Sequence, residues 1–388
     1  MRRALVRSLL IIHTSFFISH SSFSQIGTWQ SHVSYQSGQS VAVAGSKIFT
    51  ATRNGFFYYD KSTNETVTLG KTLGLSDVGI SRLLYLADQH RLLIAYRNGN
   101  LDFLTLSDSG EPGEVANLNA IVSAPNLPSS RTINHINRIG NYAYLSTDFG
   151  LLVLDLLKDE IRDTYFSLRT DGTPLPIYQT AATADSLYAL TAPSSLTMTG
   201  NRLRVVRFSA TTNLADPANW RLIQSPAASV SSILTDHNRL YVSVNGQGVF
   251  EKDSGTWKLT QRITSPIVRL FPSTTGVILA TNQAITLPAS GTFTGSVLAD
   301  PGEVVVDGNT VWVADAQNGL LAGRASTFER ITPEGPTRDQ FTSLYAYAQT
   351  LVALPNGTQD NTSVTGRQPP AEFFRCLING GAVARLPT

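Results

Sequence analysis

Cysteine is almost absent from this sequence of 388 residues, in which Cys376 is the single example. A lone cysteine has no partner for a disulfide within the chain. The fold must therefore be stabilised by burial of apolar side chains and by hydrogen bonds within sheets. No stretch of about 20 unbroken apolar residues is present either, so no membrane span is predicted.

Basic charge is also scarce once the first residues are set aside. Residues 1–24 have the pattern of a secretory signal peptide. The pattern consists of Arg2, Arg3 and Arg7, the apolar residues 9–18, and the small-x-small sequence Ser22-Phe23-Ser24. Cleavage before Gln25 leaves 27 basic against 28 acidic side chains, a formal charge of −1. We therefore predict an exported protein of the periplasm or the outer membrane and cell surface, and no nucleic-acid binding.

The motifs of catalysis and metal binding are missing as well. Gly70-Lys71-Thr72 resembles the end of a phosphate-binding loop, but Glu65 stands where that loop requires glycine. A Gly-x-Ser-x-Gly elbow is absent. The histidines that follow the signal are each over 40 residues from the next: His32, His90, His135 and His237. No enzyme activity, cofactor or metal site is therefore predicted.

A β-hairpin unit recurs along the chain, in place of any long helical periodicity. Each unit is a hydrophobic strand with a small residue at its middle, a short turn that usually contains glycine, and a second hydrophobic strand; residues 48–60, 92–104 and 142–155 are the clearest copies. The small residues are about 34 to 54 positions apart: Ala51, Ala95, Ser146, Ala189, Ser243, Ala280 and Ala314. This spacing is typical of a four-stranded propeller blade.

Seven such units predict an all-β chain in which residues 25–328 form a seven-bladed β-propeller. The small residues are expected on the strands nearest the central channel, where neighbouring strands crowd one another. The segment around Trp29 and Val33 is expected to add a strand to the last blade and so latch the ring. The turn glycines are expected to supply positive φ.

The pattern weakens beyond this propeller. Residues 331–336 indicate a linker, and residues 329–370 are interpreted as the incomplete start of a second propeller-like domain, with one strand over 344–354. The tail, residues 371–388, lacks the repeat. We interpret it as an aberrant segment from an interrupted reading frame or a truncated gene product.

Three stretches carry a family resemblance: Leu73-Gly74-Leu75-Ser76-Asp77, the run 93–102, and Phe149-Gly150-Leu151 leading to residues 159–165. Together with the linker, they resemble the PorZ family, two-propeller components of the type IX secretion system of Bacteroidota, over most of residues 25–355. The first stretch also resembles propeller repeats in sensor domains of hybrid two-component systems. The chain departs from the PorZ pattern by lacking most of the second propeller and the C-terminal β-sandwich.

The resemblance implies a non-enzymatic accessory component of the attachment complex at the bacterial outer membrane. Its implied partners are a sortase-like peptidase, outer-membrane barrel proteins and anionic lipopolysaccharide. Two alternatives stay open, namely the periplasmic sensor propeller of a two-component system and a carbohydrate-active propeller enzyme that uses carboxylates such as Asp148 and Asp163.

Binding residues are predicted at one turn of the second hairpin unit. Asn98, Asn100 and Asp102 follow its first strand and could present two amides and a carboxylate near one mouth of the ring. A structural explanation exists for part of this pattern, because an Asn-Gly pair is also what a tight hairpin turn requires.

Overall fold

The computed structural model describes residues 33–166, 173–193, 202–209, 211–227, 230–253, 255–288, 291–336, 341–347, 350–355, 374–377 and 381–385. The chain divides into two compact units, one of His32–Asp339 and one of Met1–Ser31 with Gln340–Thr388. The predicted signal peptide, residues 1–24, lies outside the described residues. Within the ranges given above, no helix is long and apolar enough to cross a membrane.

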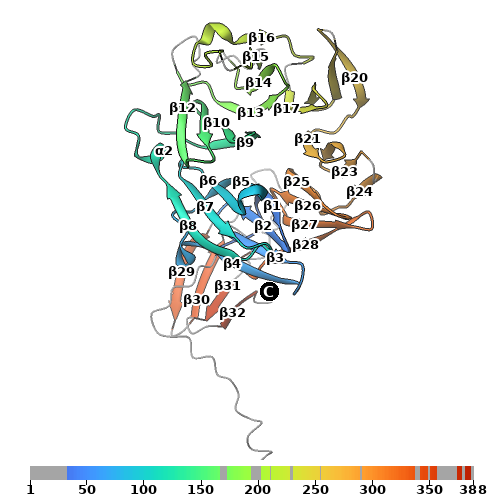
Figure 1. Ribbon diagram of the computed structural model, residues 1–388. Coiled ribbons are helices and arrows are strands. Elements are labelled where there is room, and N and C mark those ends of the chain that lie inside the picture. The colour runs from blue at the N-terminus through green and yellow to red at the C-terminus, as the bar shows by residue number, and fades with distance from the viewer. Residues whose placement is uncertain are drawn as a thin grey trace, which may run out of the picture. The chain divides into compact units, whose positions relative to one another are not determined.

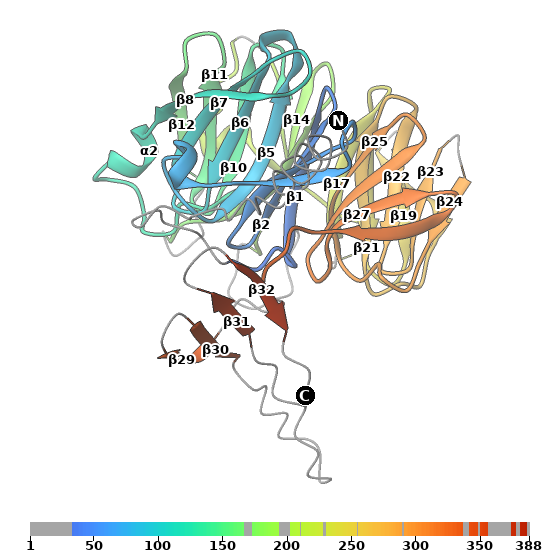
Figure 2. The ribbon, with the colours of Figure 1, turned by 90° about the horizontal axis from the view of Figure 1, so that it is seen from below.

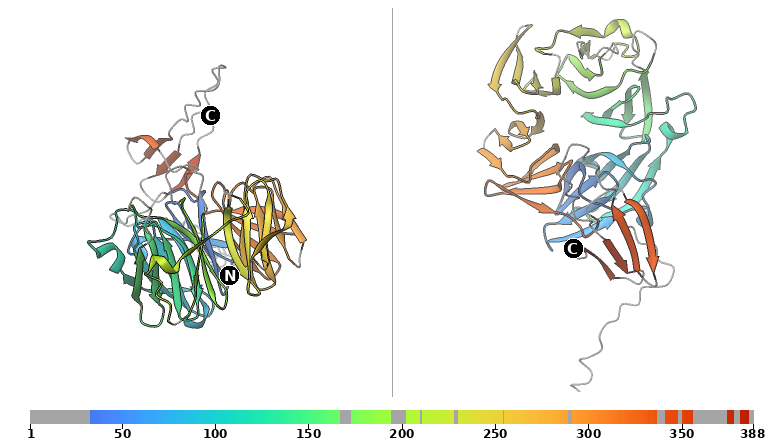
Figure 3. Two further views of the ribbon diagram at one scale, coloured as in Figure 1. Left: turned by 90° about the horizontal axis from the view of Figure 1, so that it is seen from above. Right: turned by 180° about the vertical axis from the view of Figure 1, so that it is seen from behind.

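The larger unit is a seven-bladed β-propeller, which confirms the fold predicted from the hairpin repeat. Seven four-stranded antiparallel sheets are arranged around a common centre, and each is built from four consecutive strands (Figures 1 and 3). Short helical turns lie in some of the connections between strands: η2 (Lys71–Leu73), η3 (Ala87–Gln89), α2 (Ala120–Ser123) and η4 (Pro217–Asn219).

The strands of the first four blades follow the chain in order. Blade 1 comprises β1 (Gly38–Ala44), β2 (Lys47–Thr52), β3 (Phe56–Asp60) and β4 (Glu65–Leu69), and blade 2 comprises β5 (Ile80–Leu86), β6 (Arg91–Tyr96), β7 (Leu101–Leu106) and β8 (Pro112–Leu118). Blade 3 comprises β9 (Ile133–Ile139), β10 (Tyr142–Thr147), β11 (Gly150–Asp155) and β12 (Glu160–Phe166), and blade 4 comprises β13 (Ile177–Ala182), β14 (Ser186–Thr191), β15 (Leu203–Arg207) and β16 (Arg221–Ile223).

The remaining three blades repeat the arrangement. Blade 5 comprises β17 (Val230–Asp236), β18 (Arg239–Val244), β19 (Gly248–Asp253) and β20 (Thr256–Arg262), and blade 6 comprises β21 (Val268–Ser273), β22 (Gly276–Thr281), β23 (Ala284–Leu287) and β24 (Gly291–Thr294). Blade 7 comprises β25 (Pro301–Asp307), β26 (Thr310–Asp315), β27 (Gly319–Arg324) and β28 (Thr327–Ile331).

The hairpin read from the sequence is the second and third strand of each blade, not the strand nearest the channel. Ala51 lies on β2 and Ala314 on β26, whereas the first strands β1, β5, β9, β13, β17, β21 and β25 face the centre (Figure 1). The predicted position of the small residues is therefore wrong. Five of them, all alanines, belong to hydrophobic clusters that fill the seams between neighbouring blades, where a larger side chain would collide with the next sheet.

Among the described residues, the ring closes by contacts between blades 7 and 1 and without a shared strand. Blade 7 has four strands of its own, so the predicted latch strand from the N-terminal segment is wrong for the described residues; Trp29 lies outside them. Instead Val33 and Tyr35 join the cluster between blades 7 and 1, in which Trp312 is fully buried. The Tyr35 ring meets Phe57 edge-on, with centroids 5.5 Å apart.

Seven hydrophobic clusters fill the seven seams of the propeller, and they are unequal in size. The seam between blades 1 and 2 contains 14 buried residues, among them Phe49 and Tyr96. Among the described residues, the seam between blades 5 and 6 contains four buried ones, namely Val249, Val268, Leu270 and Leu279, with partly buried residues packed against them. Since burial of apolar surface is the main stabilising term, the blades are not held to one another with equal strength.

The smaller unit contributes one four-stranded antiparallel sheet. Its strands are β29 (Phe341–Tyr347), β30 (Thr350–Pro355), β31 (Phe374–Leu377) and β32 (Gly381–Arg385), in that order. The single strand predicted over residues 344–354 is thus two strands of a hairpin, and the tail supplies two more (Figure 2). The sheet has the strand order of a blade, and its assignment to a second propeller stays a prediction.

Candidate functional site

The first strand of every blade lines a central channel with a volume of about 710 Å³. Its wall is about half polar and half apolar, and the polar part includes Arg82, His135, Gln179, Arg269 and Glu303. First strands of a propeller are sheet edges, so their backbone N–H groups lack a partner strand on the channel side and must find other acceptors.

A polar ring of seven residues supplies several of these acceptors. Each member is the direct cross-strand partner of one small residue of the sequence repeat: Ser40, Arg82, His135, Thr180, Ser232, Arg269 and Glu303. Directly paired residues of antiparallel strands share one face of the sheet, so the small residue leaves room for its larger partner. The repeat thus marks the ring, at a position about 11 residues before each small residue.

Ring side chains connect some neighbouring blades at the channel wall. The Ser40 hydroxyl accepts a hydrogen bond of 2.9 Å from the backbone N–H of Leu83 in blade 2. The carboxylate of Glu303 accepts from the Val41 N–H at 3.1 Å, and also from the Ser40 hydroxyl, which joins blade 7 to blade 1. The ring therefore completes the hydrogen bonding of the inner strands.

Burial shifts the titration of the charged ring members. Desolvation raises the pKa of Glu303 and lowers the pKa of Arg82. Desolvation, with a contribution from the positive charge of Arg82, lowers the pKa of His135 to about 3, so this imidazole is neutral at physiological pH. Arg269 donates to Asp300 at 2.6 Å.

Some polar atoms of the channel have no partner among the described residues. They are His135 Nδ1, Asn137 Nδ2 and Thr180 Oγ1, on the neighbouring strands β9 and β13. A buried polar atom without a partner costs about 1–3 kcal/mol unless water or a ligand reaches it. The channel is therefore suited to hold water or a small polar molecule.

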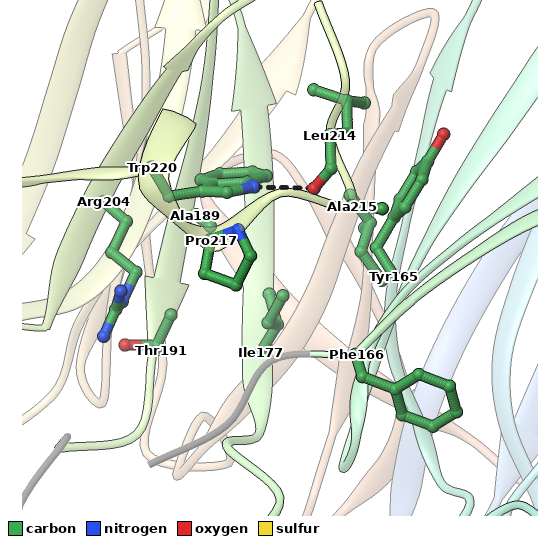
Figure 4. Close-up of a pocket in the computed structure, with 11 residues that line it drawn as sticks. Tyr165, Phe166, Ile177, Ala189, Thr191, Arg204, Leu214, Ala215, Pro217 and Trp220 are labelled. Atoms are coloured by element: carbon green, nitrogen blue, oxygen red, sulfur yellow. Dashed lines mark hydrogen bonds between the residues drawn. The ribbon is translucent and has the colours of Figure 1, made fainter. Parts of the chain in front are cut away.

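A second cavity lies between blades 3 and 4 and has a different character. Its volume is about 270 Å³, and nine of the eleven residues that line it are aromatic or aliphatic, although about half of the exposed wall is polar (Figure 4). Tyr165 and Phe166 come from β12, Trp220 from the segment after η4, and a single charged side chain, Arg204, from β15. The hairpin repeat supplies Leu151 and Ala189 of this wall, but its aromatic residues come from the outer strand β12 and from a connection of irregular sequence, which the repeat does not indicate.

The residues predicted to bind lie at the turn from β6 to β7, and none of them lines the channel. Asn98 is exposed, and its amide donates to the carboxylate of Asp77. Asp102 is fully buried, and its carboxylate accepts hydrogen bonds from Ser76 N–H at 2.9 Å, Tyr96 Oη at 2.6 Å and Asn117 Nδ2 at 2.8 Å.

Asn100 is also inside this network. It is 7% exposed, and its side-chain oxygen accepts hydrogen bonds from Leu101 N–H and Asn117 Nδ2. Asn100 and Asp102 therefore act as internal partners that fix the turn, which leaves Asn98 as the member with an accessible side chain. Ligand binding at these three residues stays a prediction.

The acidic residues considered for catalysis are occupied by neighbouring side chains. Asp148 accepts from Asn134 Nδ2 at 2.9 Å and from the Ser130 hydroxyl, and Asp163 pairs with Arg162 at 3.2 Å. Among the residues that the structure describes, no group of three His, Cys, Asp or Glu side chains is placed to hold a metal ion.

Comparison with known proteins supports the resemblance drawn from the sequence. Residues 48–221 match the family model described as the type IX secretion system PorZ N-terminal β-propeller domain. No curated protein matches the chain by sequence. The resemblance to PorZ is thereby confirmed for this part of the propeller.

Solved structures of three kinds are similar to the chain. PorZ, described as an essential bacterial surface component of the type IX secretion system of Porphyromonas gingivalis, aligns with a TM-score of 0.71 and 22% identity over 93% of this chain and 46% of that chain. The extracellular domain of a putative hybrid two-component system from B. thetaiotaomicron aligns with a TM-score of 0.55 and 14% identity over 91% of this chain and 47% of that chain.

The WD40 propeller domain of Doa1 aligns with a TM-score of 0.53 and 10% identity, over 76% of this chain and 95% of that domain. At these identities the structural matches establish the propeller fold alone. The chain spans about half the length of the PorZ structure that it matches.

Proposed function

Because its propeller matches the N-terminal domain of PorZ over residues 48–221, we propose that this chain is a binding component of type IX secretion. It works at the outer membrane or cell surface, where it docks protein partners and catalyses no reaction. The family match is the single observation that carries this proposal. The closed ring of seven rigid sheets adds support, since such a disc presents binding surfaces without needing a reactive centre.

Its partners are a sortase-like peptidase and outer-membrane barrel proteins, with anionic lipopolysaccharide as a further ligand. These partners come from the family resemblance. A surface suited to docking a protein lies at the connection between β4 and β5, where the side chains of Leu73 and Val78 are 58% and 64% exposed. Asn98 borders it through its hydrogen bond to Asp77. Exposed apolar side chains beside polar groups are typical of protein-binding patches.

The test is to tag the mature chain, crosslink it on living cells, and identify by mass spectrometry what is recovered from the outer-membrane fraction. We expect the sortase-like peptidase, its barrel partners and lipopolysaccharide. The double variant Leu73→Asp/Val78→Asp should reduce recovery of the protein partners by about tenfold or more. Leu157→Asp is the matched control, because Leu157 is 66% exposed in the turn of blade 3 between β11 and β12.

Two results would contradict the proposal. One is recovery of the chain without any type IX component, and the other is recovery with a membrane-bound histidine kinase. The second result would favour a sensor propeller. The similarity in fold to the extracellular domain of a two-component system supports this alternative. If Leu157→Asp and the double variant lose partners to the same extent, the connection between β4 and β5 is not the docking surface.

A further inference from the structure

The cavity between blades 3 and 4 is a pocket that the proposed docking function does not use. We propose that it binds a ligand with a carboxylate on an aromatic or other flat apolar body, and that Arg204 pairs with the carboxylate. The ligand is either a free aryl carboxylate or the C-terminal residue of a peptide, which share this chemistry. This binding role is independent of the proposed part in secretion.

The wall of the pocket is built to receive an aromatic ring. Tyr165 and Phe166 approach from blade 3, and Trp220 with Ile177 and Leu214 from blade 4 (Figure 4). The indole of Trp220 is fixed by a hydrogen bond of 2.9 Å from its Nε1 to the carbonyl oxygen of Leu214. Aromatic walls held in place in this way bind flat apolar groups by stacking or edge contacts.

Arg204 is the one charged residue of this wall, and it has no counter-ion among the described residues. Its Nε is buried and makes no hydrogen bond to any described residue. Burial lowers the pKa of the guanidinium, which shows that the surroundings penalise its charge. Arg204 is paired across the sheet with Ala189, whose small side chain leaves the space beside it open. A carboxylate placed there would relieve the penalty through a charge-assisted, bidentate pair.

The composition of the wall distinguishes between classes of anion. Apart from Arg204, the polar side-chain groups are the hydroxyls of Thr191 and Tyr165 and the Trp220 Nε1–H, which already donates to Leu214. A sugar brings many hydroxyls that would lose water without gaining partners, which disfavours binding. A carboxylate on an apolar body needs one cation and otherwise apolar contacts. The volume of about 270 Å³ lies just under the range of about 300–1,000 Å³ for drug-sized ligands and suits one aromatic residue.

The test uses the full chain and matched pairs of probes. Binding of 3-phenylpropanoate is compared with that of 3-phenylpropanamide, and a hexapeptide ending in phenylalanine is compared with its C-terminal amide, by titration calorimetry and by tryptophan fluorescence. We expect both carboxylates to bind and both amides to bind about 10- to 100-fold more weakly, because a hydrogen bond to a charged group is lost. The tighter of the two carboxylates identifies the source of the ligand.

Two arginines of one strand provide the matched variants. Arg204→Gln should weaken carboxylate binding by about 10- to 100-fold, whereas Arg207→Gln, which removes an exposed charge from the same strand β15, should leave it unchanged. If Arg204→Gln does not fold, Ala215→Phe provides a second variant, since Ala215 lies on the exposed rim and a larger side chain there fills the pocket.

Three results would overturn the proposal. The first is equal binding of the carboxylates and their amides, the second is binding that survives both Arg204→Gln and Ala215→Phe, and the third is binding of glucuronate in preference to both aryl carboxylates. None of these results bears on the docking surface between β4 and β5, so this proposal and the proposed function can fail separately.

Discussion

Replacing Lys47 by methionine should destabilise the propeller by removing a buried charge at the seam of blades 1 and 2. Lys47 begins β2, and its side chain is 3% exposed. Its ammonium lies 2.5 Å from Asp60 Oδ2 and 2.6 Å from Glu111 Oε1, which precedes β8 of blade 2. Burial alone would lower the pKa of Lys47, but the hydrogen bonds to both carboxylates outweigh burial and raise the pKa.

The magnitude follows from what Lys47→Met leaves behind. The Asp60 side chain is 10% exposed, so its carboxylate would stay buried without a counter-ion, which typically costs about 3–5 kcal/mol. An unfolding entropy of about 0.6 kcal/mol/K for a propeller of about 300 residues converts this into a fall in Tm of about 5–8 °C. Scanning calorimetry at pH 7 measures it directly. The double variant Lys47→Met/Asp60→Leu should regain most of the loss, because neither member of the buried pair is then left without its partner, and Glu111 is 55% exposed and reaches water.

The pH dependence separates this explanation from simple loss of packing. Hydrogen bonds from Lys47 and from Ser62 hold the pKa of Asp60 well below its usual range. The stability contributed by Asp60 is therefore present above the unfolded pKa of about 3.9 and is lost as the pH falls below it. The difference in Tm between wild type and Lys47→Met should shrink toward pH 3. A fall of less than 1 °C at pH 7, or a double variant less stable than the single one, would refute the reasoning.

Three further predictions concern the interior of the propeller. Asp102→Ala should lower the free energy of unfolding by about 3 kcal/mol or more, because three donors lose their acceptor. Asn98→Ala, at an exposed position, should change it by no more than about 0.5 kcal/mol. Urea titration measures both. His135 is neutral in the fold but becomes protonated in the unfolded chain as the pH falls. The free energy of unfolding should therefore decrease by up to about 2 kcal/mol between pH 7.5 and pH 4.5. Thermal melts of His135→Gln at the same pH values should show a smaller decrease. Gly319 has φ of +75°, and a Cβ there would lie 2.5 Å from the Tyr35 carbonyl oxygen, so Gly319→Ala should cost more than 1 kcal/mol; an unchanged melting temperature would contradict this.

The fold was predictable from the sequence because the second and third strands of several blades are buried on both faces. Strands such as β2 and β11 are buried at every residue and read as continuous hydrophobic runs. The outer strands, such as β4, alternate between exposed and intermediate positions and give a weak signal. The inner strands include polar residues that face the channel. The sequence therefore shows the small residues but not their place in the blade, because only the packed ring shows which strand faces the centre.

The site was less accessible to prediction, for a physical reason. Each blade contributes one member of the polar ring, so Arg82 and Glu303 become neighbours of one channel only after all seven sheets have closed. Arg204 of blade 4 likewise shares a pocket with Tyr165 of blade 3 only because the two sheets pack together at a seam. Asp102 was predicted to be accessible at a turn, but hydrogen bonds from Asn117 on the adjacent strand and from Tyr96 occupy its carboxylate. The residues around Asp102 in the sequence do not indicate these partners.

The inequality of the seams has a mechanical consequence. When a closed ring of blades is strained, the seams share the load, and the ring opens first at the seam that separates at the lowest force. That seam is the one between blades 5 and 6, with its four buried residues, and not the seam between blades 7 and 1 where the ends of the ring meet. Thermal breathing, protease access and any forced passage of the disc through a narrow space would thus be concentrated beside Val249 and Leu270, on the far side of the ring from the well-packed blades 1 and 2.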